Sequence, residues 1–128
     1  MFKVKAIENK EEQKRLCDAC GTEYAEKAFA YAAYDIKSAD DECGEVIGVC
    51  QFTITGTPAM LCLSPATGRE SDEAMLILGF AVLEFLRRCR FEAVVATIPE
   101  SYATRLGFRK TEDGLTLDLT AGRACGGH

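Results

Sequence analysis

The chain has 128 residues, 48% of them hydrophobic and 27% charged, which is the composition of one globular domain with its own core. Its formal net charge is −5, from 20 acidic and 15 basic residues. An acidic chain repels a polyphosphate backbone unless its cations cluster, and the one local group is Arg87, Arg88 and Arg90. Nucleic acid is therefore not an expected partner.

The sequence also indicates where the protein works. The amino-terminal segment MFKVKAIENKEEQKRL lacks the uninterrupted apolar stretch of a signal peptide. The longest apolar run, Ala74 to Leu83, is about half of what a bilayer crossing requires and predicts a buried helix. Seven cysteines, an odd number at apolar positions, are typical of free thiols in a reducing compartment. We therefore expect a cytoplasmic protein that does not enter a membrane.

The amino-terminal half begins with a short strand from Phe2 to Ile7. Asn9 followed by Glu12 has the spacing of a helix cap with a reciprocal carboxylate, so a helix is expected from Lys10 to Cys20, closed by Gly21. Three strands then follow one another through short turns, which predicts an antiparallel meander. Their expected ranges are Ala28–Ile36, Glu45–Thr55 and Ala59–Leu63.

In the second half, the stretch SPATGRESDEAMLIL leads from the last of these strands into a long apolar helix, Asp72 to Arg88. The next strand, Phe91 to Ile98, completes a right-handed crossover with locally parallel pairing. The remaining elements are a short helix, Ser101–Leu106, ended by Gly107, and a hairpin about Asp113-Gly114 made of Phe108–Thr111 and Leu115–Leu119. We expect one domain over residues 1–120 and a loose, Gly-rich tail over 121–128.

This order of elements, with LGFRK before the final hairpin, resembles the GNAT superfamily of N-acyltransferases. The resemblance is most specific in GEVIGVCQF, GFAVLEFLRRCRFEAVVATI and ATRLGFRK. It implies an α+β (mixed α/β) fold with a central mixed sheet of about six to seven strands and helices on both faces. It also implies an activity: transfer of an acyl group from acetyl-CoA or another acyl-CoA to a small-molecule or peptide amine, with no metal.

The resemblance further implies where the donor binds. In the family, acyl-coenzyme A lies in a V-shaped gap between the fourth and fifth strands, here Ala59–Leu63 and Phe91–Ile98. Its pantetheine bonds to fourth-strand backbone, and its pyrophosphate rests on the amides that open the central helix. The cofactor-binding positions that this mapping implies are Leu61, Leu63, Gly68, Arg69 and Ser71.

The helix start departs from the family's phosphate loop, which carries more glycine. The segment TGRESDEAM has one glycine, Gly68, and three carboxylates: Glu70, Asp72 and Glu73. It can be interpreted as a phosphate cradle using Gly68 and Arg69, or as a helix start, capped by Ser71 or Thr67, whose carboxylates replace the ligand's charge. We favour the second interpretation because the carboxylates would repel a pyrophosphate. The alternative function is then a non-catalytic domain that binds a small molecule or a protein partner.

The catalytic groups are equally open. A tyrosine on the short helix usually protonates the leaving thiolate in this family, but aligned on LGF its position is Ala103, and Tyr102 falls one residue early. One residue is about 100° around a helix, so Tyr102 is either a general acid on a shifted helix or a rim aromatic. The candidate general bases are Asp35, Glu45 and Glu92.

Two further hypotheses concern metal and assembly. Cys17 and Cys20 have a CxxCG spacing and could form a Cys3His zinc set with Cys125 and His128, or a redox pair, although a domain with this core needs no metal to fold. The apolar face of the long helix indicates a homodimer surface if it is exposed, and core if it is not. That face comprises Met75, Leu76, Leu78, Phe80 and Val82.

Overall fold

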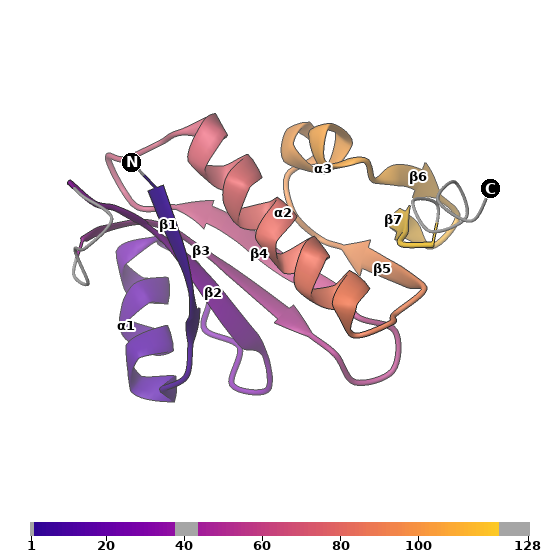
Figure 1. Cartoon of the computed structure of the whole chain (residues 1–128), viewed down its shortest axis with the longest axis horizontal. Helices are drawn as coiled ribbons and strands as arrows, with labels where there is room; N and C mark the ends of the chain where they lie inside the picture. Colours follow the sequence, from indigo (N-terminus) through magenta and orange to yellow (C-terminus); the bar gives the residue numbers. More distant parts are fainter. Residues whose placement is uncertain (1, 38–43, 121–128) are drawn as a thin grey trace.

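The computed structural model describes residues 2–37 and 44–120. The predicted tail, with Cys125 and His128, lies outside these residues. The elements follow the predicted order (Figure 1): β1 (Phe2–Ile7), α1 (Lys10–Ala19), β2 (Phe29–Asp35), β3 (Glu45–Thr53), β4 (Ala59–Pro65), α2 (Asp72–Arg88), β5 (Ala93–Ala96), α3 (Glu100–Leu106), β6 (Arg109–Thr111) and β7 (Gly114–Asp118).

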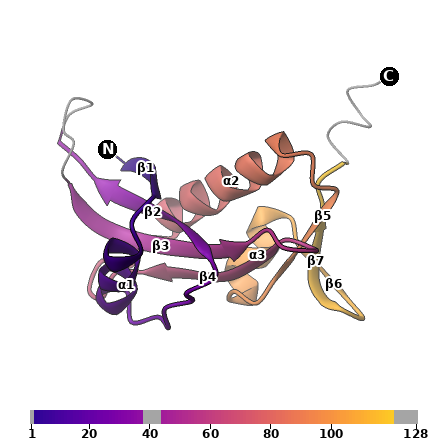
Figure 2. The same ribbon diagram turned by 90° about the horizontal axis from the view of Figure 1, so that it is seen from below.

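The strands form one seven-stranded sheet in the order β1-β2-β3-β4-β5-β7-β6. Every neighbouring pair is antiparallel except β4 and β5, which are parallel. β2, β3 and β4 run roughly along one direction, whereas β5, β7 and β6 stand at a steep angle to them (Figure 2). This mixed sheet confirms the expected fold class, and its two parts meet at the single parallel pair.

Helices cover both faces of the sheet, with α1 and α2 on opposite sides (Figure 2). α2 packs over β2, β3 and β4, and α3 lies beside α2 through Leu106, which faces Gly79. The larger core lies beneath α2 and α3; among its largest buried side chains are Phe52, Met60, Leu63, Met75, Leu78, Leu86 and Leu119. A smaller core lies beneath α1 and contains Leu16, Cys17, Cys20, Val49 and Ala66.

The helix ends follow the local chemistry of the sequence. Asn9 Oδ1 accepts hydrogen bonds from the amides of Glu11 and Glu12, at 2.8 and 3.3 Å, and so caps α1 as expected. Gly21 follows α1 with φ +61°, a left-handed conformation that glycine adopts at little cost. Ser71 Oγ accepts from the Ala74 amide at 3.2 Å and caps α2. The bounds of α2 are the predicted ones.

The fifth strand is shorter than predicted, covering Ala93–Ala96 instead of Phe91–Ile98. Phe91, the first residue of the predicted strand, instead belongs to the C-terminal end of α2. Arg90 takes a left-handed φ of 70°, and the Phe91 amide donates back to Leu86 O at 3.3 Å. β4, in contrast, runs to Pro65, two residues beyond the prediction. The lengths of these two strands therefore differ, which matters for the site.

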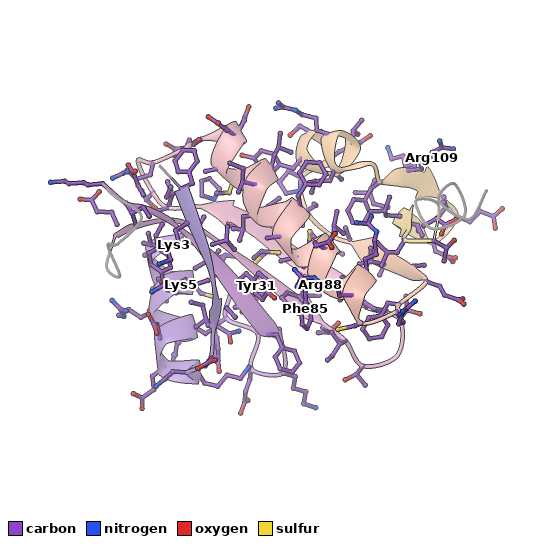
Figure 3. All side chains as sticks on the ribbon, viewed as in Figure 1. Lys3, Lys5, Tyr31, Phe85, Arg88 and Arg109 are labelled. Atoms are coloured by element: carbon purple, nitrogen blue, oxygen red, sulfur yellow. The ribbon has the colours of Figure 1, made fainter. Side chains whose placement is uncertain are left out.

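Most of the apolar face of α2 is core. Met75, Leu78 and Val82 are buried, and Leu76 is half-buried. Phe80 is 51% exposed and stands on the outer side of the helix with Ile77. Towards the end of α2, Phe85 packs on Tyr31 of β2 with ring centroids 5.8 Å apart, and Arg88 lies beside them (Figure 3). In the part of the chain that the structure describes, no helix has the length and apolarity needed to span a membrane.

Candidate functional site

The two halves of the sheet separate between β4 and β5. Parallel pairing joins Ala59 to Val95 and Met60 to Ala96, and the amides of Val95 and Thr97 donate to Pro58 O and Met60 O, both at 3.0 Å. β4 then continues to Pro65, paired with β3 on one side. Among the described residues, its other edge has no strand partner from Cys62 to Pro65. We call this edge the β4–β5 divergence.

A β-bulge marks the point where the strands part. The register between β3 and β4 shifts between Gln51 and Phe52, so that Leu61 is the extra residue on β4. A bulge bends and twists its strand, which directs β4 away from β5. The Thr97 hydroxyl donates to Leu61 O at 3.0 Å and forms the last hydrogen bond between β4 and the segment that follows β5. Leu61 therefore sits at the apex of the divergence, and Leu63, buried under α2, lies further along it.

A cavity of about 310 Å³ opens on the α1 side of this apex. Its wall on the sheet is made by Leu61, Cys62 and Gln51, and its outer wall by the loop between α1 and β2. The lining residues of that loop are Thr22, Glu23, Tyr24 and Ala25. The cavity thus places polar and aromatic groups next to the start of the divergence.

A buried pair of glutamines holds that loop in place. Gln13 Nε2 donates to Gln51 Oε1 at 3.0 Å, and both side chains are 1% exposed. Gln51 Nε2 donates to Glu23 O at 2.8 Å, and Gln51 Oε1 accepts from the Ala25 amide at 2.9 Å. Buried amides with every bond made are rigid, so the cavity wall is fixed against the sheet. Gln51 Nε2 also lies 3.4 Å from Cys62 Sγ.

The loop between β4 and α2 is tied down by its own backbone. The Ala66 amide donates to Ile47 O at 2.8 Å, and the Thr67 amide donates to Ala19 O at the end of α1, at 3.1 Å. The Arg69 amide donates to Ala66 O at 2.9 Å across a tight turn in which Gly68 has φ +81°. The positive φ favours glycine at this position. Space does not restrict it, because a Cβ added to Gly68 would have no other atom within 4 Å.

Arg69 is part of a surface ion-pair group. Its guanidinium contacts the Asp35 carboxylate at 3.0 Å and also pairs with Glu45. Asp35 ends β2 and Glu45 begins β3, so Arg69 joins the loop before α2 to the adjoining ends of these two strands. Arg69 and two of the three candidate general bases are thus brought together with one another. The third, Glu92, is exposed in the turn before β5, and its carbonyl accepts from the Leu119 amide at 2.8 Å.

Tyr102 lies against the start of α2. Burial, followed by the neighbouring Asp72 carboxylate, raises the pKa of the Tyr102 phenol. Arg105 Nη1 lies 3.5 Å from Asp72 Oδ2, so an ion pair joins α3 to the start of α2. Ala103, at the usual tyrosine position, is fully buried in the core beneath α2.

The predicted CxxC pair lies in the small core beneath α1. Burial, then the neighbouring Cys62 and Asp18, raise the pKa of Cys17 to about 11. Burial, then Cys17 and Cys62, raise the pKa of Cys20 to about 12. Burial therefore raises the cost of forming a thiolate at both positions, and the thiolate is the form that a zinc ligand or a redox nucleophile needs. No group of three or more His, Cys, Asp or Glu suited to a metal occurs within residues 2–37 and 44–120.

Comparison with known structures identifies the fold class. An N-acetyltransferase from Staphylococcus aureus Mu50 superposes with a TM-score of 0.65 at 15% identity, over 93% of this chain and 98% of that one. A Desulfovibrio desulfuricans protein assigned to the GNAT acetyltransferase family gives a TM-score of 0.66 at 13% identity, over 93% and 99%. The IAA acetyltransferase from Bacillus cereus ATCC 14579 gives 0.63 at 19% identity, over 88% of this chain and 79% of that one.

The chain therefore has the GNAT fold, as its sequence motifs indicate. No family model and no curated protein matches the sequence. At identities below 20%, these superpositions show a common fold alone, and activity has to be argued from the site itself.

Sequence reasoning missed the residues that line the cavity, Thr22 to Ala25, Gln51 and Cys62. One signal for Gln51 was present: a glutamine stands between Cys50 and Phe52 in an otherwise apolar strand, and a polar side chain there must find buried partners. The loop residues carry no pattern of their own. Their role depends on the contact with Gln51, which lies 26 residues further along the chain from Ala25.

Proposed function

We propose that this protein is an N-acyltransferase that moves an acyl group from a thioester, such as acetyl-CoA or another acyl-CoA, to an amine. The observation that supports this proposal is the β4–β5 divergence with a cavity at its apex. An extended donor fits along the unpartnered edge of β4, where main-chain groups can bond to its amides, and its acyl end reaches Leu61. No step requires a metal or a resident cofactor.

The acceptor is a small-molecule or peptide amine that enters the cavity. Its volume of about 310 Å³ suits a small group, and it adjoins Leu61 and Cys62, where the acyl carbon would lie. The neutral amine attacks the thioester carbonyl, the bond from carbon to the donor's sulfur breaks, and the proton released by the new amide nitrogen passes through solvent to the leaving thiolate. Holding both reactants in one rigid site supplies much of the rate increase without a covalent intermediate.

The test of this proposal measures acyl transfer with the acceptor site blocked. Acetyl-CoA is incubated with a panel of small primary amines, and acylated products are quantified by mass spectrometry, since the protein's own thiols would disturb a thiol reagent. Ala25→Trp fills the cavity, so we expect the KM for the amine to rise at least about tenfold while donor binding is unchanged. Glu26→Trp is the matched control, because Glu26 is exposed on the same loop outside the cavity lining.

A second candidate function is a non-catalytic domain that binds a small molecule or a protein partner. It is favoured by Ala103 at the position where the family carries its tyrosine. Donor binding without any acylated product across the amine panel would support this candidate and contradict the transferase.

A further inference from the structure

The start of α2 carries negative charge where an acyl-CoA donor would place its pyrophosphate. Glu70, Asp72 and Glu73 are all exposed there. Carboxylates in a first turn stabilise the helix by compensating its positive end, so the dipole is already satisfied without a ligand. An incoming phosphate would meet like charges that water screens only in part.

Two arginines beside this helix start are already paired. Arg69 holds Asp35 and Glu45 on the meander, and Arg105 holds Asp72. A phosphate would have to break one of these pairs and leave a carboxylate without its partner. The arginine that the sequence offers for a phosphate cradle therefore already has two anionic partners.

Some of the backbone amides of the loop are also used. Those of Ala66, Thr67 and Arg69 donate to main-chain carbonyls, and those of Ala74 and Met75 donate to Ser71 Oγ and Ser71 O. An anion site at a helix start relies on amides that point outward with no acceptor. Here charge and side-chain pairing act against a phosphate, and the amides that are already bonded leave fewer donors for one.

The rest of the donor path has a different character. The β4 edge from Cys62 to Pro65 offers main-chain groups to a neutral ligand, and the cavity beyond it is lined by Tyr24, Gln51 and other residues of which Glu23 alone is charged. An uncharged arm with amide groups, ending in a thioester, matches these surfaces.

We infer that this protein recognises its donor through the acyl group and the uncharged pantetheine arm, and that the nucleotide pyrophosphate adds no affinity. The inference rests on the proposed acyl-transfer function and specifies its substrate class: acyl thioesters of pantetheine, with or without a nucleotide. It makes the acidic start of α2 a determinant of donor specificity.

The experiment compares acetyl-CoA with S-acetyl-pantetheine, which has the same arm and no nucleotide, by calorimetry on the full chain. We expect dissociation constants within about threefold of each other. Raising the salt concentration from about 50 to about 500 mM shortens the screening length, so acetyl-CoA should bind more tightly while S-acetyl-pantetheine is unaffected. A phosphate cradle gives the opposite sign, because salt weakens an attraction.

The matched variants are Glu70→Gln with Glu73→Gln, and Glu84→Gln on the same helix away from its start. Neutralising Glu70 and Glu73 should tighten acetyl-CoA about fivefold or more and leave S-acetyl-pantetheine unchanged, whereas Glu84→Gln should change neither. Binding of acetyl-CoA more than about thirtyfold tighter than S-acetyl-pantetheine, weakened by salt, would overturn this inference alone. Absence of binding by both ligands at millimolar concentration would overturn the proposed function as well.

Discussion

At the scale of single residues, the surroundings of Tyr102 make it a poor general acid. Burial, followed by the neighbouring Asp72 carboxylate, raises the pKa of its phenol, which makes transfer of its proton to a thiolate less favourable. We expect Tyr102→Phe to keep kcat within about threefold of the original and to change the free energy of unfolding by less than about 1 kcal/mol, because the Asp72 carboxylate beside it is exposed. Steady-state kinetics and urea unfolding measure the two effects. A fall in kcat of about a hundredfold would instead establish Tyr102 as the general acid.

Arg90 occupies a backbone conformation that suits glycine. Its φ of 70° costs an ordinary residue about 1–2 kcal/mol. A glycine at this position would avoid that cost, but it would lose part of the gain because glycine has more conformational freedom in the unfolded chain. We therefore expect Arg90→Gly to raise the free energy of unfolding by about 0.5–1 kcal/mol and Tm by about 2–4 °C. Arg88→Gly, inside the last turn of α2, is the control and should lower Tm. A lower Tm for Arg90→Gly would show that the Arg90 side chain contributes more than its backbone costs.

Individual site residues could be predicted only where the residues that determine their role lie close by in the sequence. Ser71 was predicted as a possible cap from local sequence, and it is one, because a cap depends on the next three residues. The partners of Arg69 lie 34 and 24 residues earlier in the chain, and nothing in TGRESDEAM indicates them. The roles of Tyr102 and of the predicted cofactor-binding residues stay predictions that the experiments above address.

At the scale of elements, α2 lies very close to β3 at Gly48. A Cβ at this position would lie 2.1 Å from Met75 Cε and 3.0 Å from Ser64 O, so both the helix and the neighbouring strand restrict it. Gly48→Ala should lower the free energy of unfolding by about 1–3 kcal/mol through overpacking. Urea unfolding of Gly48→Ala, Met75→Ala and the double variant measures it. The double variant should lose less than the sum of the two single losses, and simple additivity would contradict the proposed contact.

The core beneath α1 predicts a loss of stability in alkali. The pKa values of Cys17 and Cys20 are raised to about 11 and about 12, from an ordinary thiol value of 9.0. Between these limits the unfolded chain releases protons that the folded chain keeps, so rising pH favours unfolding. Stability from these thiols is complete below about pH 9 and falls from there to about pH 12. Urea midpoints at several pH values test this slope: Cys17→Ala with Cys20→Ala should flatten it, and Cys89→Ala, at an exposed thiol, should not.

Helices and turns were predicted better than the ends of strands. Asp72–Arg88 has an acidic start, a long apolar run and a basic end, all of which are local signals, and its bounds are as predicted. The fifth strand was predicted too long because Phe91 and Ile98 are apolar in sequence, while their backbones serve the end of α2 and the turn into α3. The bulge at Leu61 depends on how β4 meets two different neighbours, which no local pattern records.

At the scale of the whole molecule, one parallel pair joins two parts of the sheet that run in different directions (Figure 2). This arrangement follows from the order of elements, a meander followed by a crossover and a hairpin, and that order was predictable from turns and periodicity. Its consequence is the unpartnered edge of β4 beside a rigid cavity. The formal net charge of −5 includes the carboxylates at the start of α2, on which the proposed preference for an uncharged donor arm rests.

The central claim is that the β4–β5 divergence binds a thioester donor. Backbone amide chemical shifts of the labelled protein, recorded while S-acetyl-pantetheine is added to millimolar concentration, test it most directly. We expect shift changes concentrated at Leu61–Ser64 and Val95–Ile98, with smaller ones at Thr22–Ala25 and none at the start of α2. Changes concentrated elsewhere, or none at all, would contradict it.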